Sequence, residues 1–167
     1  MVTLVKASPD DIITELESVA NFVSKIFDDE PIMYYQHVPK QPEEGSISVI
    51  FQNATVEQET ALTYVDIREW QIIVFGKKDT EIAADPSVLR AMESIKKATI
   101  GAARQVIPLN DGSLRYMRIV NNGFSYGMPV KTEDGRWASV GILQTEVRRA
   151  RDFETYKKIM EAGVRIN

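Results

Sequence analysis

The chain has 167 residues, of which 44% are apolar and 26% charged, and its net charge is −4. A chain of this length buries roughly 70% of its extended surface, so we expect a single domain over residues 1–167. The absence of cysteine excludes a disulfide framework, a thiolate nucleophile and a Cys-ligated zinc, and the acidic balance argues against a dedicated duplex-DNA binder. Because we find no secretion signal and no 18-residue apolar run, we expect no membrane contact.

The first fifty residues predict one helix, a short extended piece and a strand. Ser8-Pro9-Asp10-Asp11 is a helix start, and an apolar stripe follows it to near Asp28 (Ile12, Leu16, Val19, Val23 and Ile26). Three prolines limit the next segment to a short extended piece over 33–38, at a sheet edge. Alternation over 46–51 predicts a strand, and we expect the polar residues 52–60 to form a connection.

The stretch LTYVDIREWQIIVFGK, residues 62–77, predicts a long strand whose environment changes along its length. From Trp70 to Phe75 nearly every residue is apolar, as in a strand covered on both faces. Over 63–69 apolar residues instead alternate with Asp66 and Arg68, which is typical of a strand half exposed to solvent or to a partner. We therefore expect this first half, with Glu69 at its end, to leave the core and become contact surface.

The second half predicts a helix, three strands and a final helix. Asp85-Pro86 opens a helix that ends near Gly101 and turns one face inward (Val88, Met92, Ile95 and Thr99). Three turn signals then predict strands in meander order over 114–120, 124–130 and 137–147 (Asn110-Asp111-Gly112, Asn121-Asn122-Gly123 and Asp134-Gly135). A short helix over 152–162 follows. This order favours an α+β fold: a mainly antiparallel sheet packed by two or three helices, with an extended β-hairpin.

Few residues point to catalysis. His37 is the only imidazole, and no second histidine or metal-ligand spacing surrounds it. Neither glycine-rich nucleotide motif occurs, and the acidic clusters lack the spacing of a calcium loop. We therefore expect no enzyme activity, no cofactor and no metal site.

Some charged and aromatic residues are candidates for an interface with another copy of the chain or with another protein. The only basic cluster lies where the last strand meets the last helix, and is either a solvated strand end or a docking site for an acidic rim or a DNA backbone. Trp70 is expected in the core, whereas Trp137 either packs down or contacts a neighbour. The candidate interface residues are Asp66, Arg68, Glu69, Arg136, Trp137, Arg148, Arg149 and Arg151.

Six segments carry a resemblance to a known family: SPDDIITELESV, PIMYYQHVPKQP, SISVIFQN, LTYVDIREWQIIVFGK, DPSVLRAMESIKKA and TEVRRARD. In this order they resemble the tail terminators of long-tailed bacteriophages, and the wider neck family of head-tail joining proteins almost as well. The resemblance implies a structural virion protein that forms a ring, typically of six subunits. Such a ring caps the tail tube, stops its polymerisation and offers a head-tail joining surface.

The same resemblance implies the partners and the location. The partners would be further copies of the chain, the tail tube protein, a head connector or completion protein, and a sheath protein where the tail is contractile. DNA would pass through the lumen without sequence-specific binding, and the protein, made in the bacterial host cytoplasm, would reside in the tail or neck of the virion. The alternatives are a head-completion or connector protein, a monomeric protein-binding module, and a small enzyme that uses His37.

Overall fold

The computed structural model describes residues 11–78, 86–100 and 106–150. Strands hold 48% of these residues and helices 22%. In chain order the described elements are α1 (Asp11–Ser24), β1 (Met33–Tyr35), β2 (Ile47–Gln58), β3 (Thr63–Lys78), α2 (Pro86–Ile100), β4 (Val106–Pro108), β5 (Tyr116–Tyr126), β6 (Val130–Lys131) and β7 (Arg136–Ala150).

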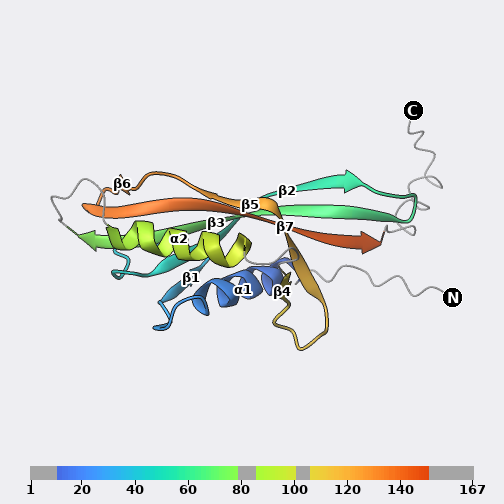
Figure 1. Cartoon of the computed structure of the whole chain (residues 1–167), viewed down its shortest axis with the longest axis horizontal. Helices are drawn as coiled ribbons and strands as arrows, with labels where there is room; N and C mark the ends of the chain where they lie inside the picture. Colours follow the sequence, from blue (N-terminus) through green and yellow to red (C-terminus); the bar gives the residue numbers. More distant parts are fainter. Residues whose placement is uncertain (1–10, 79–85, 101–105, 151–167) are drawn as a thin grey trace.

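The described strands form one sheet in the order β1-β2-β3-β7-β5-β4, and β6 pairs with one end of β7. All neighbouring strands are antiparallel except β1 and β2, which run parallel with Met33 opposite Ile47. Figure 1 shows β2, β3 and β7 as long ribbons that run the length of the molecule, with both helices on one face.

The main core lies between the helices and the sheet face that they cover. Leu16, Val19 and Val23 of α1 contribute to it from one helix. Trp70 of β3 is fully buried at its centre, and its indole N–H donates a 2.9 Å hydrogen bond to the Thr145 hydroxyl of β7. A smaller apolar cluster occupies the opposite face of the sheet (Ile73, Phe75 and Ala138, with Ile50 and Val140 against them).

The predicted α+β class, a mainly antiparallel sheet packed by two or three helices, is wrong. The fold is dominated by a curled, mixed sheet. At 1.5 Å per residue the 14 residues of α1 reach about 21 Å, whereas at 3.3 Å per residue the 16 residues of β3 reach about 53 Å. Helices of this length cannot cover such strands, so much of the sheet lies beyond them.

Residues 52–60 are not the connection that the sequence predicted. β2 continues to Gln58, after a register shift between Phe51 and Asn53 that leaves one extra residue on this strand. The polar composition of the segment misled the prediction, because its backbone is held by pairing with β3 and its side chains stay exposed.

The predicted turn at 121–123 is also wrong, and so is the three-strand meander. β5 runs through this segment to Tyr126, with a pairing irregularity against β7 between Ile119 and Phe124. A Cβ on Gly123 would lie 2.3 Å from the Val120 carbonyl oxygen, so the glycine serves a close backbone approach inside the strand rather than a hairpin turn.

Several other predictions are confirmed. The first helix exists with its apolar stripe inward, although it ends at Ser24 rather than near Asp28. All four predicted inward positions of α2 are buried, and β1 lies at the sheet edge. Gly112 and Gly135 have φ of 76° and 80°, as their predicted turns require. β4 was not anticipated, and the predicted helix over 152–162 lies outside the described residues.

Candidate functional site

Beyond the helices, three strands continue as a projecting end, which we define as Asn53–Gln58 of β2, Thr63–Arg68 of β3 and Glu146–Ala150 of β7. Figure 1 shows it at the right of the molecule, where β2, β3 and β7 run past α1. Every residue of its β2 portion is exposed. No described strand pairs with the outer side of this portion, because β1 pairs with β2 only at residues 47–49.

The hydrogen-bond alternation identifies which backbone groups face outward from β2. In an antiparallel pair, residues that bond to the partner strand alternate with residues that do not. The Phe75 N–H donates to the Ser46 carbonyl at 3.0 Å, so odd-numbered residues of β3 turn toward β2. Extending the register along β3 leaves Ala54, Val56 and Gln58 with their N–H and C=O groups directed away from β3. They form the outer edge of the projecting end.

A buried ion network joins α1 to the β3 and β7 portions of the projecting end. It consists of Glu15, Asp66, Arg68 and Arg149, whose side chains are only 3–14% exposed. Arg149 donates to both carboxylates at 2.7 Å, and Arg68 contacts Glu15 and lies 3.1 Å from Asp66. Two carboxylates therefore face two guanidinium groups.

The close contacts within the network oppose the effect of burial, which disfavours the charged form of its carboxylates. Burial raises the pKa of Glu15 above its ordinary 4.5, against the lowering effect of the neighbouring Arg149 and Arg68. Burying such a cluster of charges costs desolvation free energy, and removing one charged partner strongly destabilises the folded protein. The network thereby ties this part of β3 and β7 to α1.

The opposite face of the projecting end carries more exposed ion pairs. Arg148, whose side chain is 69% exposed, donates to both carboxylate oxygens of Glu59 at 2.7 and 2.6 Å. Arg118 of β5 pairs with Glu146, where β5 begins to separate from β7. The separation opens a polar groove of about 620 Å³ lined by both pairs. Exposed pairs of this kind add direction to a contact more than they add stability.

The predicted interface residues thus fall into separate places. Asp66, Arg68 and Arg149 form the internal network, so their charges are already neutralised within the chain. Glu69 accepts a 2.8 Å hydrogen bond from Gln144 on the opposite face of the sheet. Arg148 is on the same face, four residues further along β7, and pairs with Glu59.

The remaining predicted residues lie elsewhere. Arg136 and Trp137 are at the other end of β7, where Arg136 is 9% exposed and donates to the Gly76 carbonyl at 3.0 Å. Trp137 is half-buried opposite Lys131. Arg151 lies outside the described residues.

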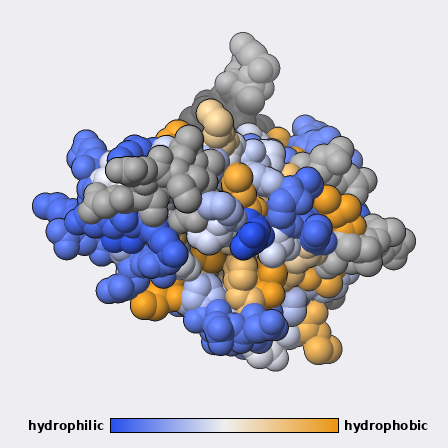
Figure 2. All heavy atoms as spheres, turned by 60° about the vertical axis from the view of Figure 1, so that its left-hand side comes forward, coloured by the Kyte–Doolittle hydropathy of each residue, from blue (hydrophilic) through white to orange (hydrophobic). Residues whose placement is uncertain are grey.

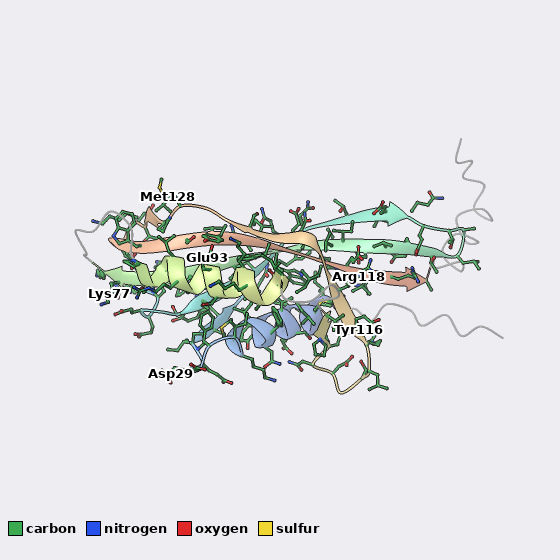
Figure 3. The ribbon with its side chains drawn as sticks, viewed as in Figure 1. Asp29, Lys77, Glu93, Tyr116, Arg118 and Met128 are labelled. Atoms are coloured by element: carbon green, nitrogen blue, oxygen red, sulfur yellow. The ribbon has the colours of Figure 1, made fainter. Side chains whose placement is uncertain are left out.

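A second titratable cluster lies beside α2. The Tyr126 hydroxyl donates to Glu93, which lowers the pKa of Glu93 and raises that of Tyr126. Figure 3 shows Glu93 on α2 and Met128 on the chain beyond β5, at the same end of the molecule. Lys96 pairs with Glu93 at 3.0 Å, so the cluster is a surface ion pair extended by a phenol.

His37 is exposed and its ring makes an edge contact with Tyr34 at 6.5 Å between ring centres. Among the residues that the structure describes, no group of three His, Asp or Glu side chains is arranged to hold a metal ion.

Sequence reasoning missed two parts of this site. Glu15 lies among the inward residues of α1, three positions after Ile12 and one before Leu16, and a carboxylate within an apolar stripe was the available signal. The outer edge had no comparable signal, because polar composition is shared by loops and exposed strands.

No protein-family model matches this chain, and no curated protein matches it.

Proposed function

We propose that this chain is a structural assembly protein that joins copies of itself through the outer edge of the projecting end, as a tail terminator of a long-tailed bacteriophage. The observation that carries the proposal is the outer side of β2, which no described strand covers beyond Val49. There Ala54, Val56 and Gln58 direct backbone groups outward, and Val56 is 66% exposed. An exposed strand edge is a template for strand addition, in which backbone hydrogen bonds supply affinity and side chains supply specificity.

The buried ion network supports the proposal because it ties β3, the strand that pairs with this edge, to α1. A strand that pairs between copies must be presented in a fixed direction, since closure into a ring depends on the rotation from one subunit to the next. The exposed Glu59–Arg148 pair lies at the end of this edge, where Glu59 directly follows Gln58, and it can help to select the register of an incoming strand.

In this proposal the ring, typically of six subunits, caps the tail tube and offers its other side to a head connector or completion protein. A sheath protein would be a further neighbour in a contractile tail. The net charge of −4 favours passage of DNA through the lumen without adhesion. Neither described helix is long and apolar enough to cross a membrane.

The test is Val56→Pro, compared with wild type by light-scattering mass and negative-stain imaging over a concentration series. The Val56 N–H faces away from β3, so proline removes an outward donor and leaves the bonds to β3 intact. Wild type is expected to form closed rings that cap purified tail tubes. Val56→Pro is expected to remain smaller, with unchanged circular dichroism.

Val56→Thr is the matched control, because it keeps the N–H and the β-branched shape. Rings formed equally well by Val56→Pro would refute the strand-edge contact. Rings that leave tube length unchanged would refute the terminator role and favour a head-completion or connector protein. A wild-type protein that is monomeric at every concentration and does not cap tubes would favour a protein-binding module.

A further inference from the structure

The third strand of the projecting end, β7, has an open edge of its own. On the side of β7 that faces away from β3, β6 pairs near the start of the strand and β5 pairs between residues 141 and 146. Beyond Glu146 no described strand pairs with this side. The projecting end is therefore a three-stranded sheet with two open edges, one on β2 and one on β7.

The edge of β7 is open because β5 turns away from it. A continued register would place Tyr116 of β5 opposite Arg148, two residues beyond the pairing of Arg118 with Glu146, but Tyr116 pairs with Pro108 of β4 instead. Figure 3 shows Arg118 near the end of β7 and Tyr116 further from it, on the side of α1. The polar groove of about 620 Å³ lies beside this part of β7, so the described chain leaves room for an incoming strand.

The backbone of this edge directs hydrogen-bonding groups outward. The Val140 carbonyl accepts a 3.1 Å hydrogen bond from the Gly127 N–H, so even-numbered residues of β7 direct their backbone groups away from β3. The pairing of β7 with β3 has no register shift over residues 138–150, so this alternation continues to the end of the strand. Arg148 and Ala150, both exposed, therefore turn their N–H and C=O groups outward, as the three outward residues of β2 do.

Away from the projecting end, the same two strands are covered. β1 pairs with the start of β2, and β6 pairs with the start of β7, where Val130 lies opposite Ala138. Figure 2, which brings the end that carries β6 forward, shows hydrophobic surface flanked by hydrophilic side chains. Among the described strands, β2 and β7 are therefore open together only at the projecting end.

The two open edges are different surfaces on opposite sides of one sheet. An edge that pairs with the same edge of another copy gives a two-fold dimer, in which both edges are occupied and growth stops. A ring instead requires head-to-tail contacts, in which one surface of a copy meets a different surface of the next. Because β3 lies between β2 and β7, a copy that pairs through β2 still offers β7 to its other neighbour.

The side chains on the two edges carry complementary charges. Glu57 of β2 is exposed and forms no ion pair within the described part of the chain. Arg148 of β7 donates to Glu59 through Nε and Nη2, and its Nη1 has no acceptor among the described residues. Glu57 lies opposite Val65, and Val65 opposite Arg148, so the two charged side chains are on the same face of the sheet. When the sheet continues into a second copy, this carboxylate can therefore meet the guanidinium group of the neighbour.

We propose that the open edge of β7 in one copy, formed by Arg148 and Ala150, pairs with the outer edge of β2 in the next copy, so that the sheet continues from subunit to subunit. This inference rests on the proposed function, which assigns self-assembly to the outer edge of β2 without naming the surface that receives it. The partner of the β7 edge is a second copy of this chain.

The variant Ala150→Pro tests the β7 edge. The Ala150 N–H faces away from β3, so proline removes an outward donor and leaves the bonds to β3 intact. Self-association, measured as light-scattering mass over a concentration series, is expected to weaken by at least roughly tenfold, with unchanged circular dichroism. Ala150→Ser keeps the N–H and is the matched control, which is expected to assemble as wild type does.

Cysteine pairs identify which edges meet, because the chain itself contains no cysteine. Thr55→Cys copies are mixed with Ala150→Cys copies, assembled, and treated with a short bismaleimide crosslinker that joins two thiols. Both positions are exposed, and Thr55 points to the same face of the sheet as Arg148. The mixture is expected to give a covalent dimer, whereas each variant alone is expected to give none.

Weakened assembly of Ala150→Pro together with the 55–150 dimer would support the inference. Assembly of Ala150→Pro at wild-type strength, or assembled protein without the 55–150 dimer, would overturn it, and a defective Val56→Pro would then leave the proposed function standing. A covalent dimer from Thr55→Cys alone would show that β2 pairs with β2, which also overturns the inference. If both proline variants assemble normally, or wild type never self-associates, the inference and the strand-edge contact fall together.

Discussion

Replacing Arg68 with methionine should lower the free energy of unfolding more than any single substitution that breaks an exposed ion pair. Arg68 contacts Glu15 and Asp66, and the side chains in this network are 3–14% exposed. Methionine keeps most of the side-chain length but leaves two buried carboxylates facing only Arg149. Removing one partner of a buried pair costs about 3–5 kcal/mol. Because Arg149 still contacts both carboxylates, we expect about 3 kcal/mol at pH 7.

The decrease in the free energy of unfolding caused by Arg68→Met should depend on pH, and the pKa of Glu15 sets the direction. The pKa of Glu15 is already raised by burial, and removal of a nearby cation raises it further. A carboxyl group whose pKa is higher in the folded than in the unfolded state binds more protons when the protein is folded. Its unfavourable contribution to the free energy of unfolding therefore becomes smaller as pH falls toward the unfolded pKa of 4.5. The deficit of Arg68→Met should therefore shrink between pH 7 and pH 5, by about 1.4 kcal/mol for each pKa unit gained within that window.

Urea unfolding at pH 7 and pH 5 measures both effects, and thermal unfolding should show a midpoint about 6–12 °C lower at pH 7. Arg118→Met is the matched control, because its side chain is 60% exposed and pairs with one carboxylate, Glu146; it should cost about 0–1 kcal/mol. If Arg68→Met costs no more than Arg118→Met, the network is screened by solvent and does not hold the projecting end.

Three further predictions concern single residues. Gly123→Ala should destabilise by about 2 kcal/mol or more, because its Cβ would lie 2.3 Å from the Val120 carbonyl oxygen; a urea midpoint equal to wild type would show that β5 can shift to accept it. Thr145→Val should cost about 1–3 kcal/mol by leaving the buried Trp70 N–H without its 2.9 Å partner, with a changed near-ultraviolet circular dichroism spectrum; no change in either would contradict the hydrogen bond. Asp111 should titrate below its ordinary pKa of 3.8, because its carboxylate accepts hydrogen bonds from Ser113 and Arg115. These bonds should hold the loop between β4 and β5 at pH values above 3.8 and be lost as pH falls through the lower pKa of the folded state. An NMR titration that gives this carboxyl group a pKa of 3.8 or higher would exclude them.

Several elements of the fold could be predicted from local sequence alone. The periodicity of α2 placed Val88, Met92 and Ile95 correctly inside, and the apolar run around Trp70 correctly indicated a buried strand. These signals succeed because helix faces and strand faces repeat over a few residues, whatever lies elsewhere in the chain.

The fold class and the projecting end could not be predicted in this way. The polar segment 52–58 is a strand because β3 pairs with it, and β1 makes the sheet mixed by running parallel to β2. Both depend on which strands meet after the chain has turned, and polar residues on an exposed strand resemble those of a loop. Because β2, β3 and β7 are so much longer in space than the helices, the sheet dominates the fold.

The candidate site divides in the same way. The sequence determined that Asp66 and Arg68 interrupt an apolar strand, and that charges gather near Arg148 and Arg149. Only the tertiary structure decided what those charges do, because Glu15 and Arg149 are 134 residues apart and meet only when α1 packs beside β7. The role of a buried charge depends on the partner that folding brings to it, and the local sequence pattern does not indicate that partner.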